Sequence, residues 1–190
     1  DFETVPGANN GEGLLPSGWI QFNATADTFS NDGSYGLSPS FGNRFDNVVA
    51  QSGIRWVAGN SLEPEEFGQV LNTPLVDGEL YRVGAWIHRS SRSDLPDDGT
   101  FVVTLRNEPD TIRVLGAFES TNTYGWQYRE FAFAAPSNSA TLNILGFSPL
   151  SAGPSGAYMG LGNVHLAAVP EPSSVMVLAA LGLVFLRRRW

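Results

Sequence analysis

The chain has 190 residues, a length typical of one domain, and it contains neither cysteine nor lysine. Without cysteine it can form no disulfide bond, no thiol nucleophile and no thiolate metal site. The formal net charge of −8 opposes binding to nucleic acid or to anionic lipid. The 21 glycines, 12 prolines and 12% aromatic residues favour a turn-rich all-β domain over a helical or disordered chain.

Short segments of strand-forming residues recur along the chain, with turn residues such as Asn31-Asp32-Gly33 and Asp97-Asp98-Gly99 between them. The pattern predicts strands at Gly18–Ala26, Asn47–Ala58, Gly68–Leu71, Leu80–Arg89, Phe101–Arg106, Thr111–Phe118, Gln127–Ala134, Thr141–Phe147 and Ala157–Ala167. No sustained helical period of apolar residues appears before the C-terminal end. Eight or nine short antiparallel strands predict a jelly-roll β-sandwich over residues 1–168.

Alternation within the segment Leu80–Arg89 separates a core face from an outer face. The predicted core residues are Tyr81, Val83, Ala85, Ile87, Phe131, Phe133, Leu142, Ile144 and Trp19. The other face of the same strand carries Arg82, Gly84, Trp86 and His88, which is an unusually polar set for the interior of a sandwich.

The outer face of this strand is the predicted binding site. A glycan site needs a flat aromatic face for the C–H side of the sugar and polar groups for its hydroxyls. Trp86 with Arg82 and His88 meets this description, and the further candidates are Trp56, Tyr124 and Trp126. The alternative for each indole is that it packs between the sheets with its N–H satisfied.

Signals for catalysis are sparse. The chain has two histidines, His88 and His165, and neither has a serine beside it in a recognisable nucleophile setting. The carboxylate pairs Glu65/Glu66 and Asp97/Asp98 are adjacent in sequence, so they point apart on an extended chain. A catalytic triad assembled only in space stays open as an alternative. The sequence predicts a non-catalytic protein with no catalytic residues.

The last 22 residues differ in character from the rest. Val169-Pro170-Glu171-Pro172-Ser173 is followed by the uncharged run Val175–Leu186 and then by Arg187-Arg188-Arg189. Prolines exclude regular structure at the start of this tail, and the apolar run predicts a short hydrophobic helix. Twelve helical residues reach about 18 Å, against about 30 Å for a bilayer core, so the predicted transmembrane segment is short. The arginines favour the cytoplasmic side, which places residues 1–168 outside.

This tail resembles the PEP-CTERM sorting signal of Gram-negative and related environmental bacteria. The resemblance rests on Pro170, Glu171, Pro172, Arg187, Arg188 and Arg189 around the apolar run. It implies recognition and processing by an exosortase during export, with transient membrane contact through the tail. It also implies an extracellular or outer-surface location and a link to exopolysaccharide or biofilm. The start at Asp1 suggests that a secretory signal peptide has been removed.

The body resembles the jelly rolls of carbohydrate-binding modules. The matching segments are Asp1-Phe2-Glu3, Gly18-Trp19, Tyr81–Trp86, Trp126-Gln127-Tyr128 and Tyr158–Leu166. In such modules an early Glu and an Asp in the last strand often help to hold a structural calcium ion. Glu3 matches this pattern and is the predicted metal ligand, whereas Gly162 stands where the Asp is expected.

The sequence therefore predicts a secreted or surface protein that binds extracellular polysaccharide without catalysis. The alternative is a structural protein that self-assembles into a homopolymeric fibre or surface layer, because a sandwich has edge strands and this chain lacks the lysines that often guard them. An enzyme, such as a polysaccharide hydrolase or lyase, is the third possibility and has the least support.

Overall fold

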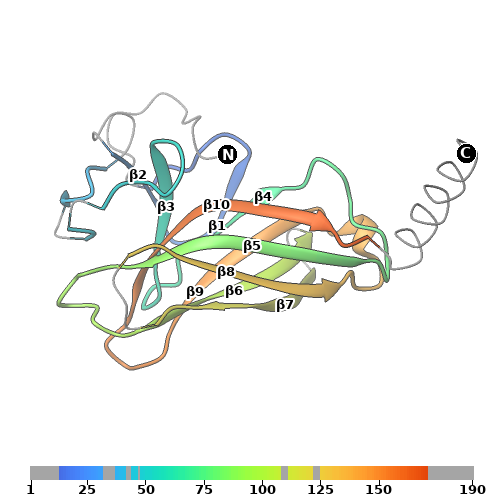
Figure 1. Cartoon of the computed structure of the whole chain (residues 1–190). Helices are drawn as coiled ribbons and strands as arrows, with labels where there is room; N and C mark the ends of the chain where they lie inside the picture. Colours follow the sequence, from blue (N-terminus) through green and yellow to red (C-terminus); the bar gives the residue numbers. More distant parts are fainter. Residues whose placement is uncertain are drawn as a thin grey trace, which may run out of the picture.

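The computed structural model describes residues 13–31, 37–41, 44–46, 48–107, 111–121 and 125–170. These residues form ten strands in two five-stranded antiparallel sheets, with one short 3-10 helix at Ser139–Thr141 (Figure 1). The all-β jelly-roll prediction is confirmed, with ten strands where eight or nine were expected. The predicted C-terminal helix lies outside the described residues. Among the described residues no helix has the length and apolar character needed to cross a membrane.

Each sheet combines strands from distant parts of the chain. The first sheet has the order β1 (Trp19–Asn23), β4 (Glu66–Val70), β9 (Ile144–Ser151), β6 (Gly99–Asn107) and β7 (Thr111–Glu119). The second has the order β2 (Asp27–Ser30), β3 (Arg55–Asn60), β10 (Tyr158–Ala168), β5 (Leu80–Arg89) and β8 (Gln127–Ala134). β10 and β5 are neighbouring inner strands of the second sheet. Their outer face is exposed wherever the flanking loops do not cover it.

The main core lies between the two sheets. Val83, Ala85 and Ile87 of β5 are fully buried, and Tyr81 is 8% exposed. Trp19 packs with its ring 5.9 Å from both Phe67 and Phe147 of the same sheet. Two more predicted core residues, Phe133 and Leu142, are buried here, and Phe131 packs against this core half-buried. Ile144 is also buried, but it is not part of this core, because its neighbour Leu145 takes the inward face of β9. The face assignment of β5 is therefore confirmed.

A second apolar cluster covers part of the outer face of the second sheet. It is built from Phe29, Leu37, Phe45, Trp56, Ala58, Leu95 and Tyr158. Phe29 stacks on Trp56 with ring centroids 5.5 Å apart, and Phe45 meets both rings edge-on. The segment that leads from β2 to β3 closes over this cluster, so one end of the outer face is sealed and the other stays open.

Two predicted strands are corrected by this arrangement. Residues 48–54 were predicted as part of a strand and are irregular, because Val48 and Ala50 both turn toward the second cluster and do not alternate between two faces. The predicted strand Gly18–Ala26 is shorter in the structure, because β1 ends at Asn23, before Ala24, whose φ is 50°. That conformation breaks pairing, and the chain passes from β1 in one sheet to β2 in the other.

Candidate functional site

The open part of the outer face carries two aromatic rings side by side. Trp86 of β5 is the cross-strand partner of Tyr128 of β8, and their ring centroids lie 5.5 Å apart. Trp86 is half-buried and Tyr128 is 37% exposed. Side chains that face each other across an antiparallel pair interact closely, so this pair forms a fixed aromatic surface on rigid strands.

A third ring joins them because of a bulge in β10. Gly162 pairs with Trp86, but His165 pairs with Gly84, so three steps along β10 match two steps along β5. Asn163, with a φ of 47°, absorbs the extra residue. The bulge turns His165 to the outer face, where its ring stacks on Tyr128 at 5.8 Å with planes 4° apart.

Gly84 makes room for this stack. A Cβ atom at position 84 would lie 2.5 Å from both the Tyr128 hydroxyl and the His165 ring. The glycine therefore lets both rings lie flat against the strand. We call Trp86, Tyr128 and His165, together with Arg82 and Glu130, the aromatic platform.

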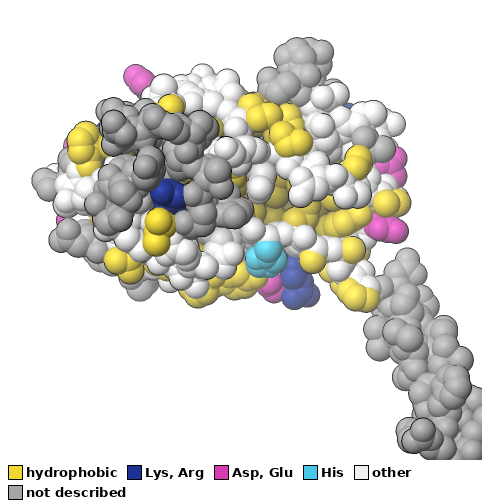
Figure 2. All heavy atoms as spheres, turned by 90° about the horizontal axis from the view of Figure 1, so that it is seen from above, with side chains coloured by type: hydrophobic (Ala, Val, Ile, Leu, Met, Phe, Trp, Pro, Cys, Tyr) yellow, Lys and Arg dark blue, Asp and Glu magenta, His cyan; other side chains and the backbone are white. Residues whose placement is uncertain are grey.

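Polar groups border the platform. The Tyr128 hydroxyl lies 2.8 Å from Oε2 of Glu130 and 3.0 Å from Nε2 of His165, and Arg82 pairs with Glu130 at 3.1 Å. Desolvation and the Glu130 carboxylate raise the pKa of Tyr128, so the hydroxyl stays protonated at neutral pH. Figure 2 shows histidine, basic and acidic side chains gathered at one place beside hydrophobic ones. Donors and acceptors thus stand next to flat rings, as sugar recognition requires.

The structure places the predicted site residues in different surroundings. Arg82 and Trp86 lie on the platform. Trp56 is fully buried beneath Phe29 and Phe45, so the prediction that it contacts a glycan at the surface is wrong. His88 shares the outer face of β5 but is only 3% exposed, because the second cluster reaches over it.

Trp126 is mainly a packing residue. It is half-buried, its Nε1 donates to the Val49 carbonyl at 2.7 Å, and its ring meets Trp56 and His88 edge-on. The remaining glycan candidate, Tyr124, lies outside the described residues. Pro170 is exposed after β10, and the other predicted sorting residues, Glu171, Pro172, Arg187, Arg188 and Arg189, also lie outside them.

Sequence reasoning missed Tyr128 and His165 as site residues. Tyr128 is two residues away from both Trp126 and Glu130, so the alternation of a strand already places these three side chains on the same outer face. His165 could be placed only with knowledge of the bulge, and the signal for that is Asn163, a residue type that tolerates the left-handed backbone conformation.

Position 162 itself provides no side-chain ligand for the predicted calcium ion. Gly162 offers no carboxylate, and a Cβ there would meet the Trp126 ring at 3.4 Å, so its surroundings are apolar. Within the described ranges no three His, Asp or Glu side chains lie close enough together to hold a metal ion. Glu3 lies outside those ranges, so its role as a ligand stays a prediction.

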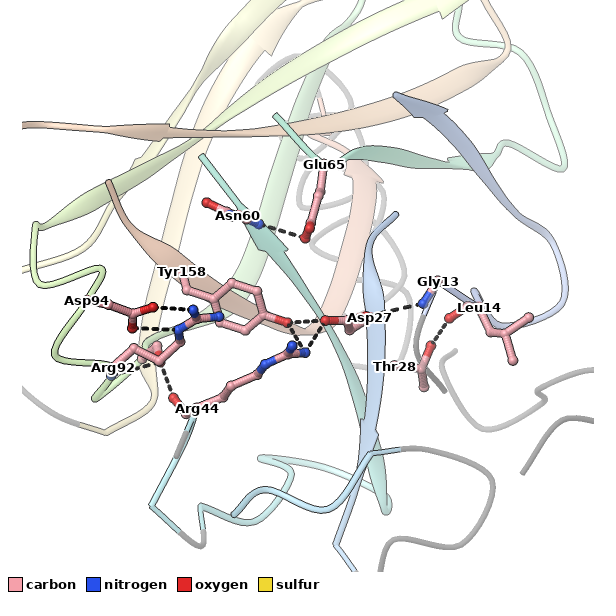
Figure 3. A network of polar contacts seen from close by, with 11 residues as sticks. Gly13, Leu14, Asp27, Thr28, Arg44, Asn60, Glu65, Arg92, Asp94 and Tyr158 are labelled. Carbon is pink, nitrogen blue, oxygen red and sulfur yellow. Dashed lines mark hydrogen bonds and ion pairs between the residues drawn. The ribbon is translucent and has the colours of Figure 1, made fainter. Parts of the chain in front are cut away.

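A buried polar network fastens the cover of the second cluster to the sheet (Figure 3). Asp27, 4% exposed, accepts hydrogen bonds from the Tyr158 hydroxyl at 2.5 Å and the Gly13 N–H at 3.1 Å, and it forms an ion pair with Arg44. The guanidiniums of Arg44 and Arg92 lie 5.3 and 5.5 Å from the Tyr158 ring centroid. The network is internally satisfied and orders the loop, so it is structural.

Comparisons with known proteins support the predictions for both the C-terminal tail and the body of the chain. Residues 168–189 match the PEP-CTERM protein-sorting motif. No curated protein matches the chain in sequence. A motif of this kind implies export, processing by an exosortase and a surface or extracellular location.

Several solved structures share the fold. A cyclase from Fischerella sp. TAU matches with a TM-score of 0.54 and 16% identity, over 82% of this chain and 87% of that one. The xylanase 10B CBM22-1–GH10 modules of Clostridium thermocellum match with a TM-score of 0.50 and 12% identity, over 80% and 26%. TmCBM61 matches with a TM-score of 0.46 and 15% identity, over 80% and 90%.

At these identities the likeness concerns the fold alone, and the fold is shared by binding modules and by enzymes. Whether the chain is catalytic must therefore be argued from its own side chains. What the comparisons and the structure establish together is a jelly-roll β-sandwich, similar to carbohydrate-binding modules and to the Fischerella cyclase, that leads into a PEP-CTERM protein-sorting motif.

Proposed function

We propose that this exported protein binds a polysaccharide of the extracellular matrix through the aromatic platform, without catalysis. The observation that carries the proposal is the row of three rings, Trp86, Tyr128 and His165, on the part of the sheet that no loop within the described residues covers. The PEP-CTERM motif supports the location, and the likeness to the xylanase 10B modules solved with xylohexaose makes a glycan a reasonable ligand class.

The platform suits a sugar chain for physical reasons. Aromatic rings stack against the C–H face of a pyranose, and the rings stand on strands, which hold them without cost in loop ordering. Arg82 and Glu130 form an ion pair whose side chains are 53% and 37% exposed. Such exposed pairs contribute little to folding stability, so sugar hydroxyls can displace water around them at small cost.

The test is retention in affinity electrophoresis, with the full chain run through gels that contain the exopolysaccharide of the producing organism. Replacing Trp86 by Ala removes the largest ring of the platform. We expect at least a tenfold weaker apparent affinity, which corresponds to about 1.4 kcal/mol, with an unchanged circular dichroism spectrum.

Val114→Ala is the matched control. Val114 is 70% exposed on β7 of the other sheet, so its truncation removes exposed apolar surface away from the platform. Equal retention of the wild type, the Trp86 variant and the Val114 variant would reject the platform as the binding site.

Self-assembly is the second candidate function, and one observation favours it. β7 is an edge strand of its sheet, and it exposes Ile112 at 51% and Val114 at 70%. An edge strand with exposed apolar side chains can serve as a template for pairing with another chain. Sedimentation velocity separates the candidates. Large species that form without polysaccharide and are lost in the Val114→Lys variant would favour assembly through β7. A small species whose sedimentation changes only when polysaccharide is added would favour binding.

A further inference from the structure

The end of the sandwich that leads into the C-terminal tail has an apolar surface. At the end of β10 the Val169 N–H donates to the Leu80 carbonyl at 2.8 Å, and the loop from β4 to β5 lies at the same end (Figure 1). On this loop Val76 is 54% exposed, and at the start of β5 Leu80 is 46% exposed. We call the surface formed by residues 71–80 and 166–170 the tail end of the sandwich.

A groove of about 290 Å³ opens at the tail end. It is lined by residues 71–75 of the loop, by Tyr81 and by residues 166–168 of β10, and most of these side chains are apolar. Single apolar residues scattered over a surface are ordinary, whereas apolar residues that gather in one place mark an interaction site. The groove, together with Val76 and Leu80, is such a gathering.

The loop holds its shape without a partner. The Val76 N–H donates to the Tyr81 hydroxyl at 3.1 Å. The Asp77 carboxylate accepts from the Ser139 N–H at 2.7 Å and from the Ser139 hydroxyl at 2.6 Å. A surface that is already ordered loses little conformational entropy when it binds.

The chain beyond the tail end soon becomes apolar. Five peptide units join Pro170 to Val175, where the uncharged run Val175–Leu186 begins. Fully extended, they span at most about 18 Å. With the run in a bilayer, as the sequence predicts, the headgroups occupy about 5–8 Å of this distance. The tail end of the sandwich is therefore held close to the membrane surface.

The shortness of the apolar run draws the body closer still. Its twelve residues reach about 18 Å as a helix, against about 30 Å for the hydrocarbon core. A bilayer accommodates such a mismatch by thinning, or by taking flanking residues into its interface. On the outer side these flanking residues lead directly to the tail end. Contact with lipid there removes exposed apolar side chains from water, which is favourable.

Charge indicates which lipid surface fits. Asp77 and Glu79 are exposed in the loop from β4 to β5, and residues 71–80 and 166–170 contain no basic residue. The whole chain has a net charge of −8. Anionic headgroups would be repelled by this charge, so the tail end suits zwitterionic lipid.

We propose that the tail end of the sandwich contacts a zwitterionic lipid surface through Val76 and Leu80 while the tail lies in the membrane. This contact needs no glycan, so it is independent of the function proposed for the platform. It also sets the orientation of the body. Trp86 is six residues from Leu80 along β5, about 20 Å, so the platform stands clear of the headgroups.

The absence of cysteine makes a direct test possible, because one cysteine can be introduced and labelled at a chosen position. The variants Val76→Cys and Leu80→Cys each carry a bimane fluorophore. The labelled full chain is reconstituted into phosphatidylcholine vesicles, with and without nitroxide groups on the lipid headgroups. We expect the nitroxide to quench both fluorophores at least threefold more strongly than a fluorophore at the other end of the sandwich.

Leu62→Cys is the matched control. Leu62 is 56% exposed and follows β3, whose last residue, Asn60, pairs with Tyr158 at the start of β10. It therefore lies at the opposite end of β10, which is about 33 Å long between Tyr158 and Ala168. Quenching that is equal at all three positions, or absent at both test positions, would overturn the proposal.

Two further measurements test other partners for this surface. Iodide in the aqueous phase should quench the fluorophore at position 76 before vesicles are added and should have less access after reconstitution. Protection from iodide without vesicles would show that the tail or a second copy covers the surface, and this would also overturn the proposal. Replacing half of the lipid by phosphatidylglycerol should weaken nitroxide quenching at position 76. Equal or stronger quenching would reject a zwitterionic surface as the preferred partner.

Discussion

At the scale of single residues, two carboxylates near the loop that covers the second cluster, Asp27 and Glu65, have different surroundings. Asp27 forms an ion pair with Arg44 and accepts a hydrogen bond from the Tyr158 hydroxyl. Glu65, nearby, accepts one hydrogen bond, from the Asn60 N–H at 2.8 Å, and is largely buried (Figure 3). Burial, followed by repulsion from Asp27, raises the pKa of Glu65 to about 7, although the Asn60 bond opposes the shift.

This raised pKa predicts a pH dependence of stability. Between pH 4.5 and 7 the folded protein keeps a proton on Glu65 that the unfolded chain has lost, so the contribution of Glu65 to stability falls as the pH rises. Glu65→Gln keeps an acceptor for Asn60 and cannot ionise. We expect the free energy of unfolding of the variant, relative to wild type, to rise by about 1–3 kcal/mol from pH 5 to pH 7.

Urea unfolding at pH 5, 6 and 7 measures this difference directly. Glu63→Gln, which removes an exposed carboxylate from the same turn, corrects for the change in net charge. A difference between Glu65→Gln and wild type that stays constant across the three pH values would show that Glu65 ionises alike in the folded and unfolded chain.

At the scale of elements, the platform depends on how β10 pairs with β5. The bulge between Gly162 and His165 brings the histidine over Gly84, and the glycine leaves the space for it. In a regular strand, Val164 would face outward and His165 would face the core. The site therefore depends on the pairing of β10 with β5 as much as on its aromatic rings.

Gly84→Ala tests this dependence without touching a ring. The added methyl group would stand 2.5 Å from the ends of the Tyr128 and His165 side chains, so both must move away from the strand. We expect polysaccharide retention to fall at least fivefold. The loss of stability should stay within about 2 kcal/mol, because the displaced side chains border solvent.

Gly162→Ala is the control for this variant. It adds the same methyl group to the same sheet, but at an ordinary contact distance of 3.4 Å from the Trp126 ring. Its retention should match wild type. If Gly84→Ala retains polysaccharide as well as Gly162→Ala does, the stacked arrangement of Tyr128 and His165 is not needed for binding.

The same elements show how far sequence reasoning reaches. β5 and β8 have the predicted bounds, Leu80–Arg89 and Gln127–Ala134, because both strands alternate regularly and turn residues flank them. β2 was missed because it has only four residues and follows a change of sheet at Ala24 that no periodicity marks. Local patterns fix strands, whereas sheet order comes from pairings between residues far apart in sequence.

The candidate site divides in the same way. The outward direction of Trp86 follows from alternation alone. The burial of Trp56 and His88 does not, because it is caused by a loop that folds over the sheet and forms a second cluster. Alternation tells which face a residue is on, and only the tertiary structure tells whether that face is covered.

At the scale of the whole molecule, charge should decide which polysaccharides the protein can approach. The tail, residues 169–190, holds three of the 11 basic residues and one of the 19 acidic ones, so the rest of the chain carries a net charge of −10. A field of this sign repels anionic polymers at distances up to the Debye length, about 30 Å at 0.01 M salt and 8 Å at 0.15 M.

We therefore expect opposite responses to salt from neutral and anionic forms of one polysaccharide. Binding to the neutral form depends on ring stacking and hydrogen bonds, so its affinity should change less than twofold between 0.01 and 0.15 M NaCl. Binding to a carboxylated form should be weak at low salt and should strengthen as screening removes the repulsion. Retention of the full chain on matched gels measures both. Tighter binding to the carboxylated form at low salt would contradict a repulsive field. Loss of that binding in EDTA would then identify a divalent cation as the bridge between the acidic surface and the polymer.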